Sequence, residues 1–201
     1  MLFMYHNIPY INSIYVYING AIMKKMQAIR VLRAWDKKGW YVFTKHMLAK
    51  LFSDDNSKTF SEGLNRLVKE GILQRACRGI YVNKDAVSFD QYVIERIAKA
   101  LRAGEYNYVS LESMLSEYGV ISQIPVDRLT VITTGREGIY KTPYGTIEMT
   151  HTKRSVTDIL NSTKIIENKP LRIATQKTAL RDLKRVGRNL DLIDEQEISD
   201  E

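Results

Sequence analysis

The side chains best suited to chemistry lie between positions 57 and 78, where hydroxyl, amide and cationic groups stand between regularly spaced apolar residues. They are Ser57, Lys58, Thr59, Ser61, Asn65, Arg66, Lys69, Arg75 and Arg78. Hydroxyl and amide groups can hydrogen-bond the edges of bases, and cations can hold phosphates or guanine. The set therefore indicates contact with a nucleic acid, and an ordinary solvated helix face is the competing interpretation.

The apolar residues of the same stretch predict the elements that would position those groups. They are Phe60, Leu64, Leu67 and Val68, which share one face of a helix with 3.6 residues per turn. Gly71 is placed to end that helix. Residues 72–73 and 80–82 predict two short strands that pair around Arg75 and Arg78. A helix followed by a basic hairpin is typical of a winged helix-turn-helix, whose helix enters the major groove of DNA.

Two further helices are predicted before this stretch, and they complete a first domain over residues 23–87. One spans 24–35, and the other follows Thr44, a favourable N-cap residue. Residues 23–84 carry 14 Lys or Arg and 5 Asp or Glu, a net charge of +9, whereas residues 85–201 carry 16 and 18, a net charge of −2. The positive excess coincides with the helix-hairpin pattern, which favours DNA binding over a basic surface without a partner.

A second domain is predicted over residues 88–190, followed by an acidic tail at 191–201. Its elements are a helix over 89–102 capped by Ser88, a helix after Ser110, a strand over 128–134, a hairpin of 139–142 with 146–152, and a helix over 175–186. The predicted fold class is α+β, with an N-terminal winged helix-turn-helix followed by a mixed α/antiparallel-β domain. The tail is expected to solvate the end of the chain or to compete with DNA for the basic domain.

Residues 1–22 contain no Lys, Arg, Asp or Glu and are rich in tyrosine. Pro9 and several asparagines interrupt the apolar run, and no basic segment precedes it, which argues against a membrane span or a signal peptide. We expect Met23 to begin the functional protein and residues 1–22 to lie outside the fold. Cys77 is the single cysteine, so no intramolecular disulfide can form, which fits a reducing cytoplasm without membrane attachment.

A second set of basic residues lies in the C-terminal domain and suggests another anion-binding or DNA-binding surface. It comprises Arg136, His151, Lys153, Arg154, Lys177, Arg181, Lys184 and Arg188. Positions 177, 181, 184 and 188 follow helical spacing and are expected to share one face. Residues 133–136 are interpreted as a phosphate nest or as a tight turn. The competing interpretations are the exposed edge of a hairpin and a solvated helix partly offset by Asp182.

No catalytic or metal-binding motif is recognisable. The three histidines lie in separate segments, and neither a P-loop, an HExxH nor a G-x-S-x-G pattern occurs. We therefore expect no enzyme activity, no metal and no cofactor. The alternative is an enzyme or RNA-acting protein that uses a phosphate-binding site around Thr134, Arg136, His151 and Arg154.

The order of these segments resembles the AbiEi-family antitoxins of bacterial type IV, abortive-infection toxin–antitoxin systems. The likeness covers residues 23–189. It rests on RGIY at 78–81, YVSLESMLSEYG at 108–119, TVITTGR at 130–136, YGTIEMTH at 144–151 and IATQKTALRDL at 173–183.

The resemblance implies a transcriptional repressor of its own operon that takes part in phage defence. Its N-terminal winged helix would bind operator DNA with inverted repeats. Its C-terminal domain would assist DNA binding and counteract a co-encoded nucleotidyltransferase-like toxin. In this family the antagonism need not involve a stable complex with the toxin, so direct contact between the two proteins stays an open alternative.

Overall fold

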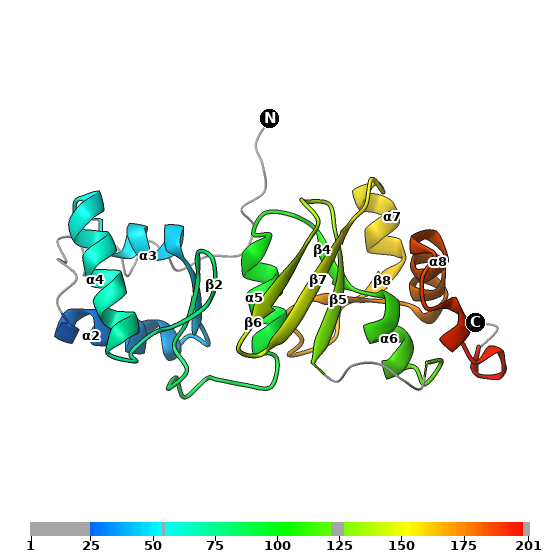
Figure 1. Cartoon of the computed structure of the whole chain (residues 1–201), viewed down its shortest axis with the longest axis horizontal. Helices are drawn as coiled ribbons and strands as arrows, with labels where there is room; N and C mark the ends of the chain where they lie inside the picture. The colour runs from blue at the N-terminus through cyan, green and yellow to red at the C-terminus, as the bar shows by residue number, and fades with distance from the viewer. Residues whose placement is uncertain (1–24, 54, 122–126, 199–201) are drawn as a thin grey trace. The chain divides into compact units, whose positions relative to one another are not determined.

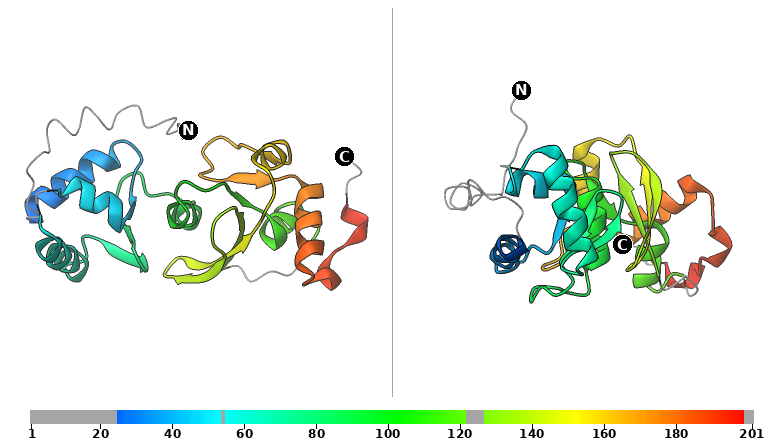
Figure 2. Two further views of the ribbon diagram at one scale, coloured as in Figure 1. Left: turned by 90° about the horizontal axis from the view of Figure 1, so that it is seen from above. Right: turned by 60° about the vertical axis from the view of Figure 1, so that its left-hand side comes forward.

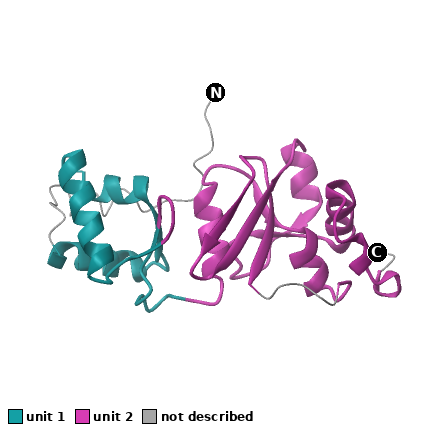
Figure 3. Ribbon diagram, in the orientation of Figure 1, with its two compact units in different colours: residues 1–75, 81–89 teal, residues 76–80, 90–201 magenta. Residues whose placement is uncertain are grey.

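The computed structural model describes residues 25–53, 55–121 and 127–198. The chain divides into two compact units, which we call unit 1 (residues 1–75 and 81–89) and unit 2 (residues 76–80 and 90–201) (Figure 3). The predicted extension at 1–22 and the last three residues of the acidic tail lie outside the described residues. Within the described parts of the chain, no helix combines the length and the apolar character needed to cross a bilayer.

Unit 1 contains three helices and most of a small sheet, whose hairpin tip at residues 76–80 is grouped with unit 2 (Figure 1). The helices are α2 (Lys25–Asp36), α3 (Lys45–Leu51) and α4 (Ser57–Lys69). The strands are β1 (Val42–Thr44), β2 (Gln74–Cys77) and β3 (Ile80–Val82), in the order β1-β3-β2. One core joins the helices and includes Val31, Leu32, Trp35, Leu48, Phe52, Phe60, Leu64 and Leu67. Burial of these side chains is the main term that stabilises the unit.

Two helix ends in unit 1 agree with the predictions from the sequence. Thr44 caps α3 as predicted, because its hydroxyl accepts a hydrogen bond from the Met47 N–H at 3.0 Å. Gly71 has the predicted left-handed conformation, with φ of +74°. The cap of α4 is Asn56, whose side-chain oxygen accepts from the N–H groups of Lys58 and Thr59. Each such cap stabilises a helix by roughly 1 kcal/mol.

The prediction of a strand at residues 72–73 is wrong. The N–H groups of Ile72 and Leu73 both bind the carbonyl of Leu67, at 3.0 and 3.2 Å, and so close the end of α4. Leu73 is buried in the helical core rather than paired in a sheet. The first strand of the hairpin is β2, which begins at Gln74.

Unit 2 is a mixed α and β structure. Its helices are α5 (Val93–Leu101), α6 (Leu111–Glu117), α7 (Val156–Asn161) and α8 (Gln176–Val186), with short 3-10 helices η1 (Leu190–Leu192) and η2 (Glu195–Glu197). Its strands are β4 (Asn107–Val109), β5 (Arg128–Thr133), β6 (Gly138–Thr142), β7 (Gly145–His151), β8 (Thr163–Lys164) and β9 (Arg172–Ala174). The predicted α+β class is confirmed at this level, as are the strand from 128 and the hairpin of β6 and β7.

The sheet of unit 2 has six strands in the order β6-β7-β5-β4-β9-β8. The sequence predicts antiparallel β, but β5–β7 and β4–β9 pair in parallel. Two parallel neighbours cannot be joined by a tight turn, because the chain must cross back before the second strand begins. Here β6 lies in the chain between β5 and β7, and several helices and strands lie between β4 and β9. From Leu129 to Thr133 every residue of β5 is buried, so both faces of this strand are covered. Helix α5 covers one face, and α6 and α8 lie on the other (Figures 1 and 2).

The predicted start of the helix that follows residue 88 is wrong. Ser88 does not cap a helix, because α5 begins only at Val93. Instead, the N–H groups of Val87 and Ser88 bind the carboxylate of Asp36 at 2.8 and 2.9 Å. The start of the acidic tail does more than solvate the end, since Ile193 forms a bridge with Ile121 and the Asp194 N–H binds the Val120 carbonyl.

Glu95 is a buried acid on α5. The residue is only 8% exposed, and its Oε2 atom has no hydrogen-bond partner among the described residues. Burial raises the pKa of Glu95, and the nearby positive charge of Lys169 offsets that rise only in part. The carboxylate form is therefore disfavoured in the folded protein.

We predict that Glu95→Gln raises the free energy of unfolding at pH 7. The folded pKa is raised, so the stability linked to Glu95 is present below the unfolded pKa and is lost as pH rises through the folded value. The gain from the substitution should thus shrink below about pH 4.5. Urea denaturation across pH measures it, with Glu167→Gln at an exposed site as the control. A variant less stable than the wild type at pH 7 would contradict the assignment.

Candidate nucleic-acid interface

Helix α4 presents a polar face opposite its buried stripe. Phe60, Gly63, Leu64 and Leu67 are buried, and this fixes the rotation of the helix about its axis. The side chains that project away from the stripe are Lys58, Glu62, Asn65 and Lys69, all exposed, with Thr59 and Arg66 exposed beside them. Of the seven predicted contact residues of this helix, five therefore lie together on one outward surface: Lys58, Thr59, Asn65, Arg66 and Lys69.

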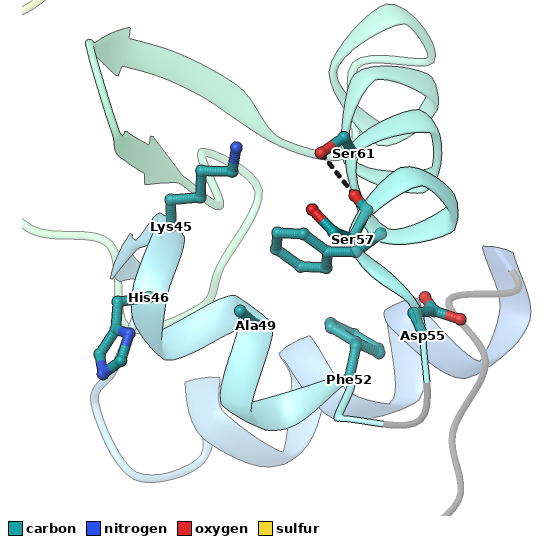
Figure 4. A pocket seen from close by; sticks show the side chains of 8 residues that line it. Lys45, His46, Ala49, Phe52, Asp55, Ser57 and Ser61 are labelled. Carbon is teal, nitrogen blue, oxygen red and sulfur yellow. Dashed lines mark hydrogen bonds between the residues drawn. The ribbon is translucent and has the colours of Figure 1, made fainter.

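An open cleft separates the N-terminal end of α4 from α3 (Figure 4). Its lining residues are Lys45, His46, Ala49, Phe52, Asp55, Ser57, Phe60 and Ser61. Within α4 the Ser61 hydroxyl donates to the Ser57 carbonyl at 2.8 Å, which occupies its proton and leaves its oxygen able to accept. Ser57 and Ser61 thus belong to the cleft side of the helix, whereas Lys58, Asn65 and Lys69 form its outermost face.

Sequence reasoning missed Lys45 and His46 as members of this surface. Both are exposed at the first turn of α3 and line the cleft that faces Ser57 and Ser61. The signal was present, because both residues directly follow the N-cap Thr44 in the basic part of the chain. A cation at the start of α3 has the charge that a phosphate contact beside α4 would need.

The two predicted cations of the hairpin lie on β2 and in the turn that follows it. Arg75 is exposed on β2, and Arg78 is exposed in the turn before Gly79. Gly79 has φ of +82°, a left-handed conformation that favours glycine. The turn therefore holds Arg78 at the end of the hairpin.

In unit 2 the predicted basic face of α8 is interrupted at its end. Lys177, Arg181 and Lys184 are exposed along the helix. Gly187 is left-handed, with φ of +72°, and ends α8, so Arg188 does not continue the face. The prediction that Arg188 shares the face of the other three is wrong, because helical spacing applies only as far as Val186.

Arg188 belongs to an internal ionic network. Its guanidinium binds both oxygens of Glu112, at 2.7 and 3.0 Å, and also binds Glu148. Glu148 in turn pairs with Arg128 at 2.8 Å. Burial raises the pKa of Glu112, but hydrogen bonds from Arg188, its own N–H and Asn189 outweigh burial and lower it overall. Arg188 therefore neutralises buried carboxylates rather than presenting a charge to a ligand.

Arg154 is held in a second internal network. Its guanidinium lies 2.6 Å from a carboxylate oxygen of Asp182, which is fully buried. The hydroxyl groups of Tyr108 and Ser110 donate to the other oxygen of Asp182, at 3.1 and 2.8 Å. Burial raises the pKa of Tyr108, and the charge of Asp182 adds to that effect. Asp182 thus offsets Arg154 directly, whereas sequence reasoning had it offset the cations of α8 in general.

The remaining predicted residues, Arg136, His151 and Lys153, are exposed. His151 Nδ1 lies 2.8 Å from the Gly135 carbonyl, which joins the end of β7 to the turn after β5. The N–H groups of Thr134 and Gly135 are already bound, to the Tyr106 carbonyl and to the Thr133 hydroxyl. They cannot also bind a phosphate, so these contacts favour the tight turn over the nest.

Comparison of the chain with protein-family models and with curated proteins finds no match. No group of three or more His, Cys, Asp or Glu side chains that could hold a metal ion occurs in the described ranges. The assignment of a site therefore depends on the geometry of the two units themselves.

We predict that Arg188→Ala lowers the free energy of unfolding by about 3 kcal/mol, because it leaves the nearly buried Glu112 without its guanidinium partner. Lys184→Ala, at an exposed position four residues away, should change it by less than about 0.5 kcal/mol. Urea denaturation followed by circular dichroism measures both. Equal, small losses in the two variants would contradict the internal role of Arg188.

Proposed function

We propose that unit 1 is a winged helix-turn-helix that binds double-stranded DNA through α4. The observation that carries the proposal is the outward face of α4, where Lys58, Asn65 and Lys69 are exposed directly opposite the buried stripe. A helix of 13 residues is about 20 Å long. That length fits the major groove, which admits one α-helix.

The neighbouring elements supply the phosphate contacts of this arrangement. Lys45 begins α3 across the cleft from α4, and the β2–β3 hairpin that follows α4 carries Arg75 and Arg78. In this docking geometry the helix reads bases while the preceding helix and the wing hold the backbone. The net charge of +9 over residues 23–84 supplies the long-range attraction to DNA.

We further propose that the protein is an antitoxin that represses its own operon and counteracts a nucleotidyltransferase-like toxin. The support for this step is the likeness to the AbiEi family in the order of five sequence segments. Unit 1 would bind inverted repeats in the operator. Unit 2 would carry the antagonism, with the exposed cations Lys177, Arg181 and Lys184 on α8 as an additional DNA-binding surface.

A second candidate function is favoured by one contact in unit 2. The bond between His151 and the Gly135 carbonyl places the exposed residues Arg136, His151 and Lys153 on adjoining segments. Two cations beside an imidazole could bind a phosphate of RNA, as an enzyme or an RNA-acting protein would need.

The proposed reading helix predicts a selective loss of DNA binding. Asn65→Ala with Arg66→Ala removes a base contact and a cation, so affinity for the upstream DNA of its own gene should fall roughly 10- to 100-fold. Both side chains are exposed, so the free energy of unfolding should change little. A gel-shift titration measures the affinity, with Lys164→Ala, exposed on β8, as the control. Unchanged affinity of the double variant would refute the assignment of α4.

The antitoxin role predicts a separation of two activities. In cells that express a nucleotidyltransferase-like toxin encoded beside this chain, the wild type should restore growth. The Asn65→Ala, Arg66→Ala variant should restore it too, because unit 2 is unaltered. Colony counts measure the effect. Failure of the wild type would contradict the antitoxin role, and loss of rescue only in Arg136→Ala with His151→Ala would favour the second candidate function.

A further inference from the structure

The outward face of α4 contains one acidic residue, Glu62, amid its cations. It is exposed and is the sole carboxylate on the helix. Its side chain makes no hydrogen bond and no ion pair with any residue that the structure describes, although Lys58 and Arg66 lie one turn away on either side. A carboxylate that served only to support the helix would be expected to pair with one of them.

The position of Glu62 makes its charge costly for DNA binding in general. It lies on the same outward stripe as Lys58, Asn65 and Lys69, opposite the buried residues of α4. In the docking described above, this stripe faces the floor of the major groove. A carboxylate there is repelled by phosphates and by the acceptor atoms of guanine, adenine and thymine.

A hydrogen bond to cytosine offsets this repulsion. The N4 amino group of cytosine is a hydrogen-bond donor in the major groove, and carboxylates accept from it. The neighbours on the stripe suit other bases, because Asn65 can bond adenine and Lys58 can bond guanine. Glu62 stands between them, one helical turn from each.

We propose that Glu62 determines sequence specificity by selecting a cytosine and rejecting the other bases at one position of the DNA site. This inference rests on the proposed DNA-binding function of unit 1. It goes beyond that function because it gives the discrimination between DNA sequences to Glu62, a residue whose negative charge lowers the affinity for DNA of any sequence.

The test is selection of binding sites from a random duplex library by the full-length protein. The wild type should prefer cytosine at one position of each half-site by at least about fivefold. Glu62→Gln, which keeps size and helix propensity, should lose that preference and shift it toward adenine, the partner of glutamine amides. It should also bind random DNA more tightly, because a negative charge is removed.

Glu70→Gln is the matched control, because Glu70 is exposed at the C-terminal cap of the same helix and pairs with Lys25 instead. It should keep the cytosine preference while also binding random DNA more tightly, which separates base selection from charge. If the wild type binds no DNA, the proposed function fails and this inference with it. If the wild type binds and Glu62→Gln retains the same cytosine preference, the inference alone is overturned.

Discussion

The packing of one apolar stripe of α4 into the core of unit 1 decides what this unit can contact. Phe60, Leu64 and Leu67 are almost completely buried against α2 and α3, and the helix cannot rotate without exposing them. Full burial of each such side chain contributes roughly 1.5–3 kcal/mol. The same packing turns Lys58, Asn65 and Lys69 outward as a set. The proposed reading surface is thus a consequence of core packing, and it needs no separate interaction to hold it in place.

Unit 2 uses many of its charges internally. Arg188, beyond the end of α8, neutralises Glu112 and Glu148, while Arg154 neutralises Asp182 on the buried face of α8. These pairs attach the segment that follows α8 to α6 and β7, and attach α8 itself to the segment after β7. Once they are formed, the cations that stay exposed in unit 2 include Lys177 and Lys184 on α8 and Arg136 in the β5–β6 turn. Unit 2 therefore presents fewer exposed cationic side chains than its count of Lys and Arg suggests.

Sequence patterns predicted the parts that depend on local physics. The apolar period of α4, the cap at Thr44 and the left-handed Gly71 follow from helix geometry and capping alone. The parts that depend on tertiary pairing were not predictable. The sequence predicts Leu73 to be a strand residue, but its side chain packs in the hydrophobic core of unit 1. Arg188 fits the period of α8, but Gly187 ends the helix and two buried carboxylates bind the guanidinium. Nothing in the amino-acid sequence of β5 or of β7 indicates that the two strands pair in parallel.

The most direct test of the account is to map the DNA contact on the protein residue by residue. Amide signals of the isotope-labelled full chain would be followed by NMR as duplex DNA from upstream of its own gene is added. The account predicts that the largest changes fall in residues 57–69, with smaller ones at Lys45, Arg75 and Arg78. Changes confined to unit 2, with α4 unperturbed at saturating DNA, would contradict it.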